Sequence, residues 1–196
     1  MSMNLSRTAL RLGQATLLLA GLAFSQIAAA QQKVNPAQSE ISFGIKEMGV
    51  PVEGRFKKWS ADIAFDPKKP EAAKVSFAID TGSASVGEPQ SDAELPKATW
   101  FNVAKFPQAT FTSSSVKAKG PGKYEVAGKL AIKGTQRDVV VPLSLAQAGA
   151  VTTATGQFTI KRLEFKIGDG DWSDTSTVAD EVTVKFKLAL SGVAPL

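Results

Sequence analysis

The sequence predicts an all-β protein, an extended barrel of eight antiparallel strands with one short helical segment. Apolar and polar residues alternate with a period of two in eight stretches, as half-buried strands require. Turn-forming Gly and Pro residues separate several of them, and helical periodicity is missing between most of them, which argues against βαβ units. Eight sequential strands most simply close into a barrel, and a two-sheet sandwich is the open alternative. The stretches are residues 41–45, 59–65, 75–79, 109–117, 124–132, 139–145, 158–160 and 182–190.

The first 30 residues differ in character from the rest. Arg7 and Arg11 come first, residues 12–24 are mostly apolar, and three alanines occupy positions 28–30. This order is typical of a secretory signal peptide, and the apolar run is shorter than the roughly 20 residues that span a bilayer. We expect residues 1–30 to be removed after Ala30, and residues 31–196 to form one exported domain.

Three strands are expected in the first half of this domain. Ile41, Phe43 and Ile45 alternate with small or polar residues, and residues 59–65 and 75–79 repeat the pattern. The prolines at positions 67 and 70 separate the second strand from the third. Because successive side chains of a strand point to opposite faces, each strand would present one apolar face to the interior.

The segment from residue 82 to residue 107 interrupts the strand pattern. Ser91 with Glu94 fits a capping box for a short helix, and Pro96 limits its length. Trp100 and Phe101 follow. A long connection of this kind is often a binding loop or lid, although a plug that merely closes one barrel end fits equally well.

Tight turns join the strands of the second half. Residues 120–122, Gly-Pro-Gly, and residues 133–135, Lys-Gly-Thr, are typical hairpin connections. After residues 158–160 the apolar positions change phase to 163, 165 and 167. This change predicts a β-bulge near Lys161 and Arg162.

Composition excludes several kinds of chemistry. The chain has no His and no Cys, so a Ser-His-Asp triad, a Cys nucleophile and a typical zinc or copper site are excluded. A formal net charge of +5 is too small to indicate nucleic-acid binding. Residues 169–174 resemble a calcium loop but place Asp174 where an EF-hand needs Gly, so we predict no metal site. An enzyme that uses carboxylates stays open as a minor hypothesis.

Several blocks of the chain resemble the YceI-like family, the polyisoprenoid-binding proteins of bacteria. They follow the family's order and cover nearly all of residues 31–196. Two positions depart from it, because Gln38 and Glu47 stand where many members carry His. The blocks are residues 39–49, 52–56, 63–67, 100–113, 128–135, 139–143, 165–168, 172–174 and 180–182.

The resemblance implies an extended, lipocalin-like antiparallel barrel in the periplasm. It also implies an amphiphilic ligand, with an isoprenoid chain in the barrel and a head group near its mouth. No cofactor is expected apart from a non-covalently bound isoprenoid lipid or quinone. A cytochrome b561-type membrane protein is a possible partner. The chain could be a monomer or a homodimer.

From the residues alone, a barrel filled by its own side chains and a barrel with a cavity are both open. The resemblance favours the cavity and a lipid carrier without catalytic residues. A solid-core module that binds a cytochrome b561-type partner is the alternative. The predicted ligand-binding residues are Phe43, Ile45, Phe56, Phe65, Phe77, Trp100, Phe101, Phe111, Leu130, Phe158, Ile160, Val184 and Phe186.

Overall fold

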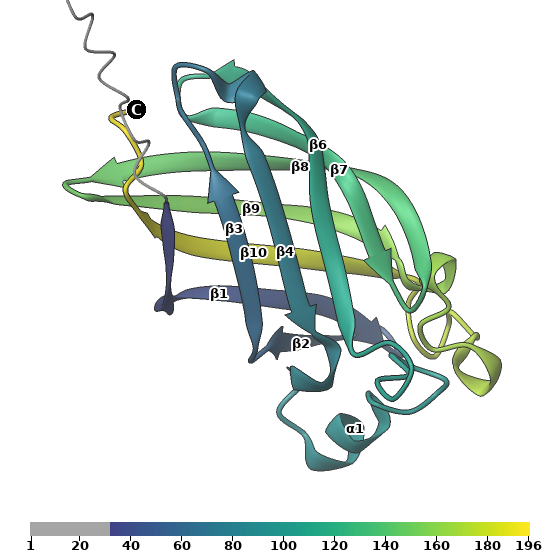
Figure 1. Cartoon of the computed structure of the whole chain (residues 1–196). Coiled ribbons are helices and arrows are strands. Elements are labelled where there is room, and N and C mark those ends of the chain that lie inside the picture. Colours follow the sequence, from purple (N-terminus) through teal and green to yellow (C-terminus); the bar gives the residue numbers. More distant parts are fainter. Residues whose placement is uncertain (1–31) are drawn as a thin grey trace, which may run out of the picture.

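The computed structural model describes residues 32–196, and the predicted signal peptide, residues 1–30, lies outside this range. The described part forms one antiparallel sheet of ten strands (Figure 1). The strands are β1 (Lys33–Glu47), β2 (Val50–Phe56), β3 (Trp59–Ala64), β4 (Lys74–Asp80), β5 (Ala84–Ser85), β6 (Gln108–Gly120), β7 (Lys123–Ile132), β8 (Thr135–Ala148), β9 (Val151–Lys161) and β10 (Glu181–Ser191).

The sheet curls into a half-barrel whose edges are β3 and β5. Its strand order is β3-β4-β6-β7-β8-β9-β10-β1-β2-β5. Side-chain packing joins β3 to β1, because Ile41 and Ile63 are both buried in the same apolar cluster. The all-β antiparallel prediction is therefore confirmed, and a single sheet rules out the sandwich.

The predicted count of eight strands is wrong, because β2 and β5 were not recognised. In β2 the residues Pro51 and Gly54 interrupt the alternation of apolar and polar residues, and both are depleted in strands. The strand β5 has only two residues, which pair with Arg55 and Phe56. A ladder that short has no periodicity to detect.

Both predicted hairpin turns are present. The turn between β7 and β8 places Lys133 at φ 47° and Gly134 at φ 75°, the left-handed backbone that the favoured two-residue turns need. The turn between β6 and β7 consists of Pro121 and Gly122, and it has positive φ at Gly122 (64°) and at Gly120 (145°), the last residue of β6.

Phenylalanine rings lie over glycines of neighbouring strands at three places around the wall. A Cβ on Gly54 would come within 2.3 Å of the Phe43 ring, and one on Gly128 or Gly156 within 2.5 Å of Phe111 or Phe186. Each ring thus occupies space that a side chain on the opposite strand would otherwise fill. Large aromatic residues can line the interior in this way without filling it.

The connection from β5 to β6 forms a lid segment, which we define as residues 86–107. It contains helix α1 (Pro89–Glu94), capped by the Glu88 carboxylate, which accepts a hydrogen bond from the Gln90 N–H. The predicted capping box at Ser91 is therefore wrong, because Pro89 already occupies the first turn, where its missing N–H costs nothing. The helix ends at Glu94, two residues before Pro96, as expected.

The predicted bulge near Lys161 and Arg162 is also wrong. Strand β9 ends at Lys161, and the chain turns into the 3₁₀-helix η3 (Arg162–Phe165). Lys166 then takes a left-handed conformation with φ 58°. A single helical turn moves apolar positions out of phase just as a bulge does, so the sequence could not separate the two.

Three further 3₁₀-helices lie in the connections. They are η1 (Pro70–Ala72), η2 (Thr81–Ser83) and η4 (Gly170–Trp172). None of the helices in residues 32–196 is long and apolar enough to cross a membrane.

Candidate functional site

A long apolar cavity lies inside the half-barrel. Its volume is about 260 Å³, larger than the roughly 150 Å³ engineered cavities that hold benzene. Val182 and Leu190 of β10 both line it, and at about 3.4 Å per residue they are roughly 27 Å apart along the strand. The cavity thus extends along most of β10, a length that suits an extended chain, and we call it the tunnel.

Every predicted ligand-binding residue lies in the lining of this cavity. The cavity argues against a barrel filled by its own side chains. The thirteen residues are Phe43, Ile45, Phe56, Phe65, Phe77, Trp100, Phe101, Phe111, Leu130, Phe158, Ile160, Val184 and Phe186.

Other lining residues were not predicted, although most lie on the same strand faces. Ile63, Val126 and Leu188 are examples, and period-two alternation alone could have found them. Arg162 also lines the cavity, and no pattern in the sequence pointed to it.

Aromatic residues of the lid segment cover one end of the cavity, the lid end. Trp100 and Phe101 are both buried, and the Phe101 ring packs edge-on against Phe56 at 6.0 Å between centroids. Phe56 in turn lies 5.3 Å from Phe43. The lid segment is thus continuous with the lining rather than attached to its outside.

The buried guanidinium of Arg162 organises the lid end. The side chain is 1% exposed, and its Nε donates a hydrogen bond to the Ala179 carbonyl. The two terminal nitrogens donate four more, at 2.6–3.0 Å, to the carbonyls of Ile167, Gly168, Trp172 and Val178. Burial lowers the pKa of this guanidinium, and the charge of Asp180 opposes that shift.

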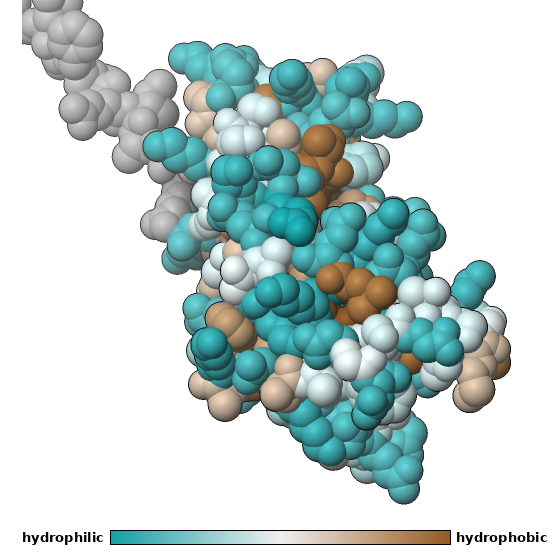
Figure 2. Space-filling view, turned by 90° about the vertical axis from the view of Figure 1, so that its right-hand side faces the viewer, coloured by the Kyte–Doolittle hydropathy of each residue, from teal (hydrophilic) through white to brown (hydrophobic). Residues whose placement is uncertain are grey.

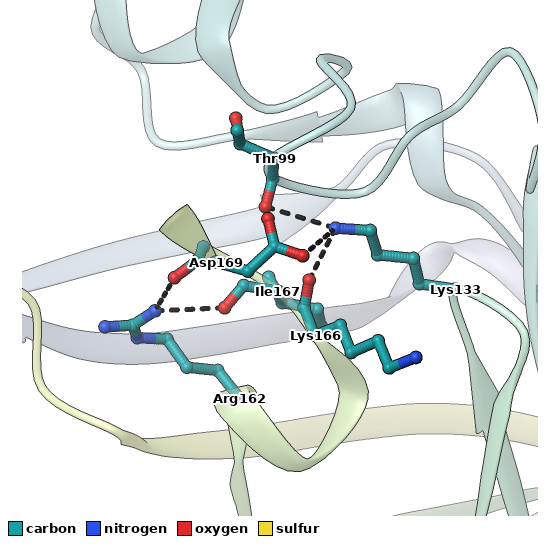
Figure 3. Close-up of polar contacts among 7 residues, drawn as sticks. Thr99, Lys133, Arg162, Lys166, Ile167 and Asp169 are labelled. Atoms are coloured by element: carbon teal, nitrogen blue, oxygen red, sulfur yellow. Dashed lines mark hydrogen bonds and ion pairs between the residues drawn. The ribbon is translucent and has the colours of Figure 1, made fainter. Parts of the chain in front are cut away.

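Lys133, at the β7–β8 turn, connects this region to the lid segment. Its Nζ donates to the carbonyls of Thr99 and Lys166 and lies 3.3 Å from the Asp169 carboxylate (Figure 3). The Thr99 carbonyl also accepts hydrogen bonds from the N–H groups of Gly168 and Asp169. We call Arg162 and Lys133, with the carbonyls that they bind, the carbonyl latch.

Asp92 fastens helix α1 to β5. Its carboxylate accepts hydrogen bonds from the Ser85 hydroxyl at 2.6 Å and from the Val86 N–H at 2.7 Å. The Ser85 hydrogen bond is the main reason why the pKa of Asp92 lies below its ordinary value, and partial burial works against that shift. The ionised carboxylate therefore holds the lid segment in place.

The wall is incomplete between β8 and β9. β9 pairs with residues 143–148 of β8, whereas residues 135–142 pair with β7 alone. Pro142 lacks an N–H to donate, and Val140 is 57% exposed. Figure 2 shows apolar side chains set among hydrophilic ones on the side of the molecule where β7 and β8 lie.

These features define a class of protein: a curled antiparallel sheet around an apolar tunnel, with a lid segment over one end. Burkholderia cenocepacia BcnA has the same fold, with a TM-score of 0.78 and 44% identity over 80% of this chain and 99% of BcnA. A polyisoprenoid binding domain from Saccharophagus degradans superimposes with a TM-score of 0.66, over 84% of this chain and 99% of that one, at 17% identity.

Residues 32–190 match the YceI-like domain, so the chain belongs to the YceI-like family. Protein YceI of Salmonella arizonae is 37% identical over 110 residues, which are 56% of this chain and 57% of that protein. The match therefore spans a little more than half the length of this curated relative.

Proposed function

We propose that the protein is a periplasmic carrier that binds an isoprenoid lipid, either a polyprenyl or a quinone-type amphiphile. The apolar tunnel carries this proposal. An isoprenoid tail would lie along β10 between Val182 and Leu190, with its head group at the lid end. Membership of the YceI-like family and the shared fold of a polyisoprenoid binding domain support it.

The size of the tunnel is compatible with useful affinity. Each buried methylene contributes about 0.8 kcal/mol, so burial of ten carbons gives about 8 kcal/mol before costs. That free energy corresponds to a Kd of about 1 μM. Ordering a flexible tail reduces this favourable free energy. A Kd of about 1 μM therefore requires more than ten enclosed carbons.

The two carboxylates with shifted pKa values fit a structural role rather than catalysis. Asp92 and Asp174 have pKa values lowered by local hydrogen bonds, in each case first from a serine hydroxyl. A carboxyl that acts as a general acid near neutral pH needs the opposite shift. Neither residue lines the cavity.

A matched pair of variants tests the proposal. Ala109 lines the cavity, and its neighbour Thr110 is exposed on the outer face of β6. The full chain and both variants would be expressed in a bacterial host, and the purified proteins extracted with organic solvent for mass spectrometry. We expect an isoprenoid from the unaltered protein and from Thr110→Phe, and at least tenfold less from Ala109→Phe.

Two results would count against a lipid carrier with its ligand in the tunnel. An unaltered protein that yields no isoprenoid, and that also fails to bind added ubiquinone, would contradict the proposal. Binding that is equal in the two variants would place the lipid outside the tunnel.

We further propose that a cytochrome b561-type membrane protein is a partner, to which a quinone-type ligand could pass. Co-purification from detergent-solubilised membranes checks this. Capture that is unchanged by Ala109→Phe would show that the partner recognises the outside of the protein and not the loaded ligand.

A further inference from the structure

The most exposed large apolar side chains of residues 32–196 lie together at one turn. Met48 is 78% exposed and Val50 is 63% exposed, the two highest values among these residues. Gly49 lies between them, in the two-residue turn that joins β1 to β2. Pro51, which follows, is also exposed. We call residues 48–51 the apolar tip.

The apolar tip lies at the rim of the lid end. The Met48 N–H donates a hydrogen bond to the Thr177 carbonyl at 2.8 Å, and Glu47 forms a β-bridge with Val178. Val178 is buried in the same apolar cluster as Trp100 of the lid segment. The backbone of the turn is therefore anchored at the lid end, while the Met48 side chain stays in solvent.

The inward face of the sheet continues onto the apolar tip. Glu47 and Val52 both line the cavity. Val50 lies opposite Glu47 in the ladder between β1 and β2, and it comes two residues before Val52. Its side chain is therefore on the same face of the sheet as both of them. The lining of the tunnel thus extends past its rim as an exposed apolar residue.

The backbone of the turn does not favour methionine at position 48. Met48 has φ 47° and Gly49 has φ 81°, and a hairpin turn with two such residues favours Asn or Asp before Gly. Most other side chains are strained at positive φ. Because Met48 also buries little apolar surface, folding gains neither conformational nor packing stability from it. A residue that breaks local rules without such a gain indicates a contact outside the chain.

The charges beside the apolar tip do not favour an anionic surface. Lys46 and Glu47 precede the turn, and Glu53 of β2 pairs with Lys185 at 2.9 Å. Asp174 lies in the loop that the turn contacts. These five residues carry two positive and three negative charges, whereas attraction to anionic lipids depends on clustered basic residues.

The apolar tip is small for a protein partner. A stable protein interface buries about 800 Å² on each side, far more than three neighbouring side chains supply. A lipid bilayer needs no complementary surface, because each methylene that leaves water contributes separately. The apolar tip therefore suits the surface of a bilayer without net charge better than the surface of a protein.

We propose that the apolar tip inserts into the surface of a zwitterionic phospholipid bilayer, with Met48 and Val50 in the lipid, and so brings the lid end against the membrane. The contact extends the proposed carrier function, since a carrier exchanges its lipid with a membrane. The contact itself does not depend on what the tunnel holds.

The test measures flotation of the protein with vesicles of phosphatidylcholine and phosphatidylethanolamine. Met48→Asn combined with Val50→Thr removes the apolar side chains, and Asn suits position 48 of the turn. We expect this tip variant to bind the vesicles about tenfold more weakly and to unfold at the same or a higher urea concentration. Addition of phosphatidylglycerol should not strengthen binding of the unaltered protein, and high salt should not weaken it.

Val140→Thr combined with Val151→Thr is the matched control. Both valines are exposed, and Val151 pairs with Ser191, at the opposite end of β10 from the lid end. The control variant should bind vesicles as the unaltered protein does. All proteins would be expressed as full chains, and their masses would establish that they share one N-terminus, because residues 12–24 are also apolar.

Three results would each overturn the membrane contact: no flotation of the unaltered protein, binding that requires phosphatidylglycerol and disappears at high salt, or binding that the tip variant weakens no more than the control. The isoprenoid content of the same preparations, measured by mass spectrometry, tests the carrier function separately. Isoprenoid without flotation rejects only the membrane contact, and flotation without isoprenoid rejects only the carrier function.

Discussion

The wall of the cavity and its lid end are stabilised in different ways. The wall is a ten-stranded antiparallel sheet, in which β8 and β9 pair over only part of their length. Its stability is nevertheless spread over many backbone hydrogen bonds and apolar contacts. The lid end consists of short irregular segments that the carbonyl latch and Asp92 hold together. Local opening depends on the contacts of the segment that opens. The lid end can therefore be loosened by single substitutions that leave the wall intact.

The largest effect should come from Arg162→Met. This change removes five hydrogen bonds and leaves buried carbonyls without donors, which cost about 1–3 kcal/mol each when unpaired. Relaxation of the structure and entry of water would offset part of the total cost of these unpaired carbonyls. We therefore expect the free energy of unfolding, measured by urea denaturation, to fall by about 3–5 kcal/mol.

Arg137→Met is the control for that substitution. Arg137 is a half-exposed residue of β8 whose Nε lies 3.8 Å from the Glu164 carboxylate. Exposed ion pairs contribute about 0–1 kcal/mol, so its loss should be small. Comparable losses in the two variants would mean that the carbonyl latch does not hold the lid end.

An intermediate effect is expected in the wall from Gly156→Ala. The new Cβ would meet the Phe186 ring and the Pro142 carbonyl oxygen, each at 2.5 Å. Overpacking of this kind costs about 1–3 kcal/mol. Movement of the ring toward the interior should also narrow the tunnel and lower the amount of bound isoprenoid, measured by mass spectrometry.

Gly44→Ala provides the comparison for the wall. Its Cβ would meet only the flexible carboxylate of Glu53, at 3.2 Å, so both stability and lipid content should stay close to the unaltered values. If Gly156→Ala retains full lipid content, the Phe186 ring does not limit the width of the tunnel.

The smallest expected effect is on the pH dependence of stability, through Asp92 in the lid segment. The folded-state pKa of Asp92 lies below its ordinary value of about 4. Its stabilising contribution is therefore present above that value and is lost as the pH falls through the folded-state pKa. Asp92→Asn should be slightly less stable at pH 7 and should lose less stability on acidification. A variant with the same pH profile as the unaltered protein would show that the Ser85 hydrogen bond does not stabilise the folded state.

The contrast between wall and lid end also explains what the sequence could predict. Residues such as Phe43, Phe111 and Phe186 follow a period of two, and this periodicity determines which face of a strand is inward. Their place in the cavity lining was therefore predictable. Periodicity does not identify the ligand. The isoprenoid ligand was suggested by the family resemblance, and it stays a prediction.

The lid end could not be predicted in the same way. Arg162 binds carbonyls of residues 167–179, and such contacts depend on how a loop folds back rather than on any pattern of residue types. The same limitation applies to Lys133, whose partners Thr99 and Lys166 lie more than 30 residues away on either side. Alternation of apolar residues carries no information about either contact.

The proposed carrier function requires an isoprenoid chain inside the tunnel. The most direct measurement is a crystal structure of the protein purified with its lipid. We expect continuous electron density inside the tunnel, along β10 from Val182 to Leu190. Lining side chains that close over the tunnel, with the lipid bound on the outer surface, would contradict the proposed carrier function.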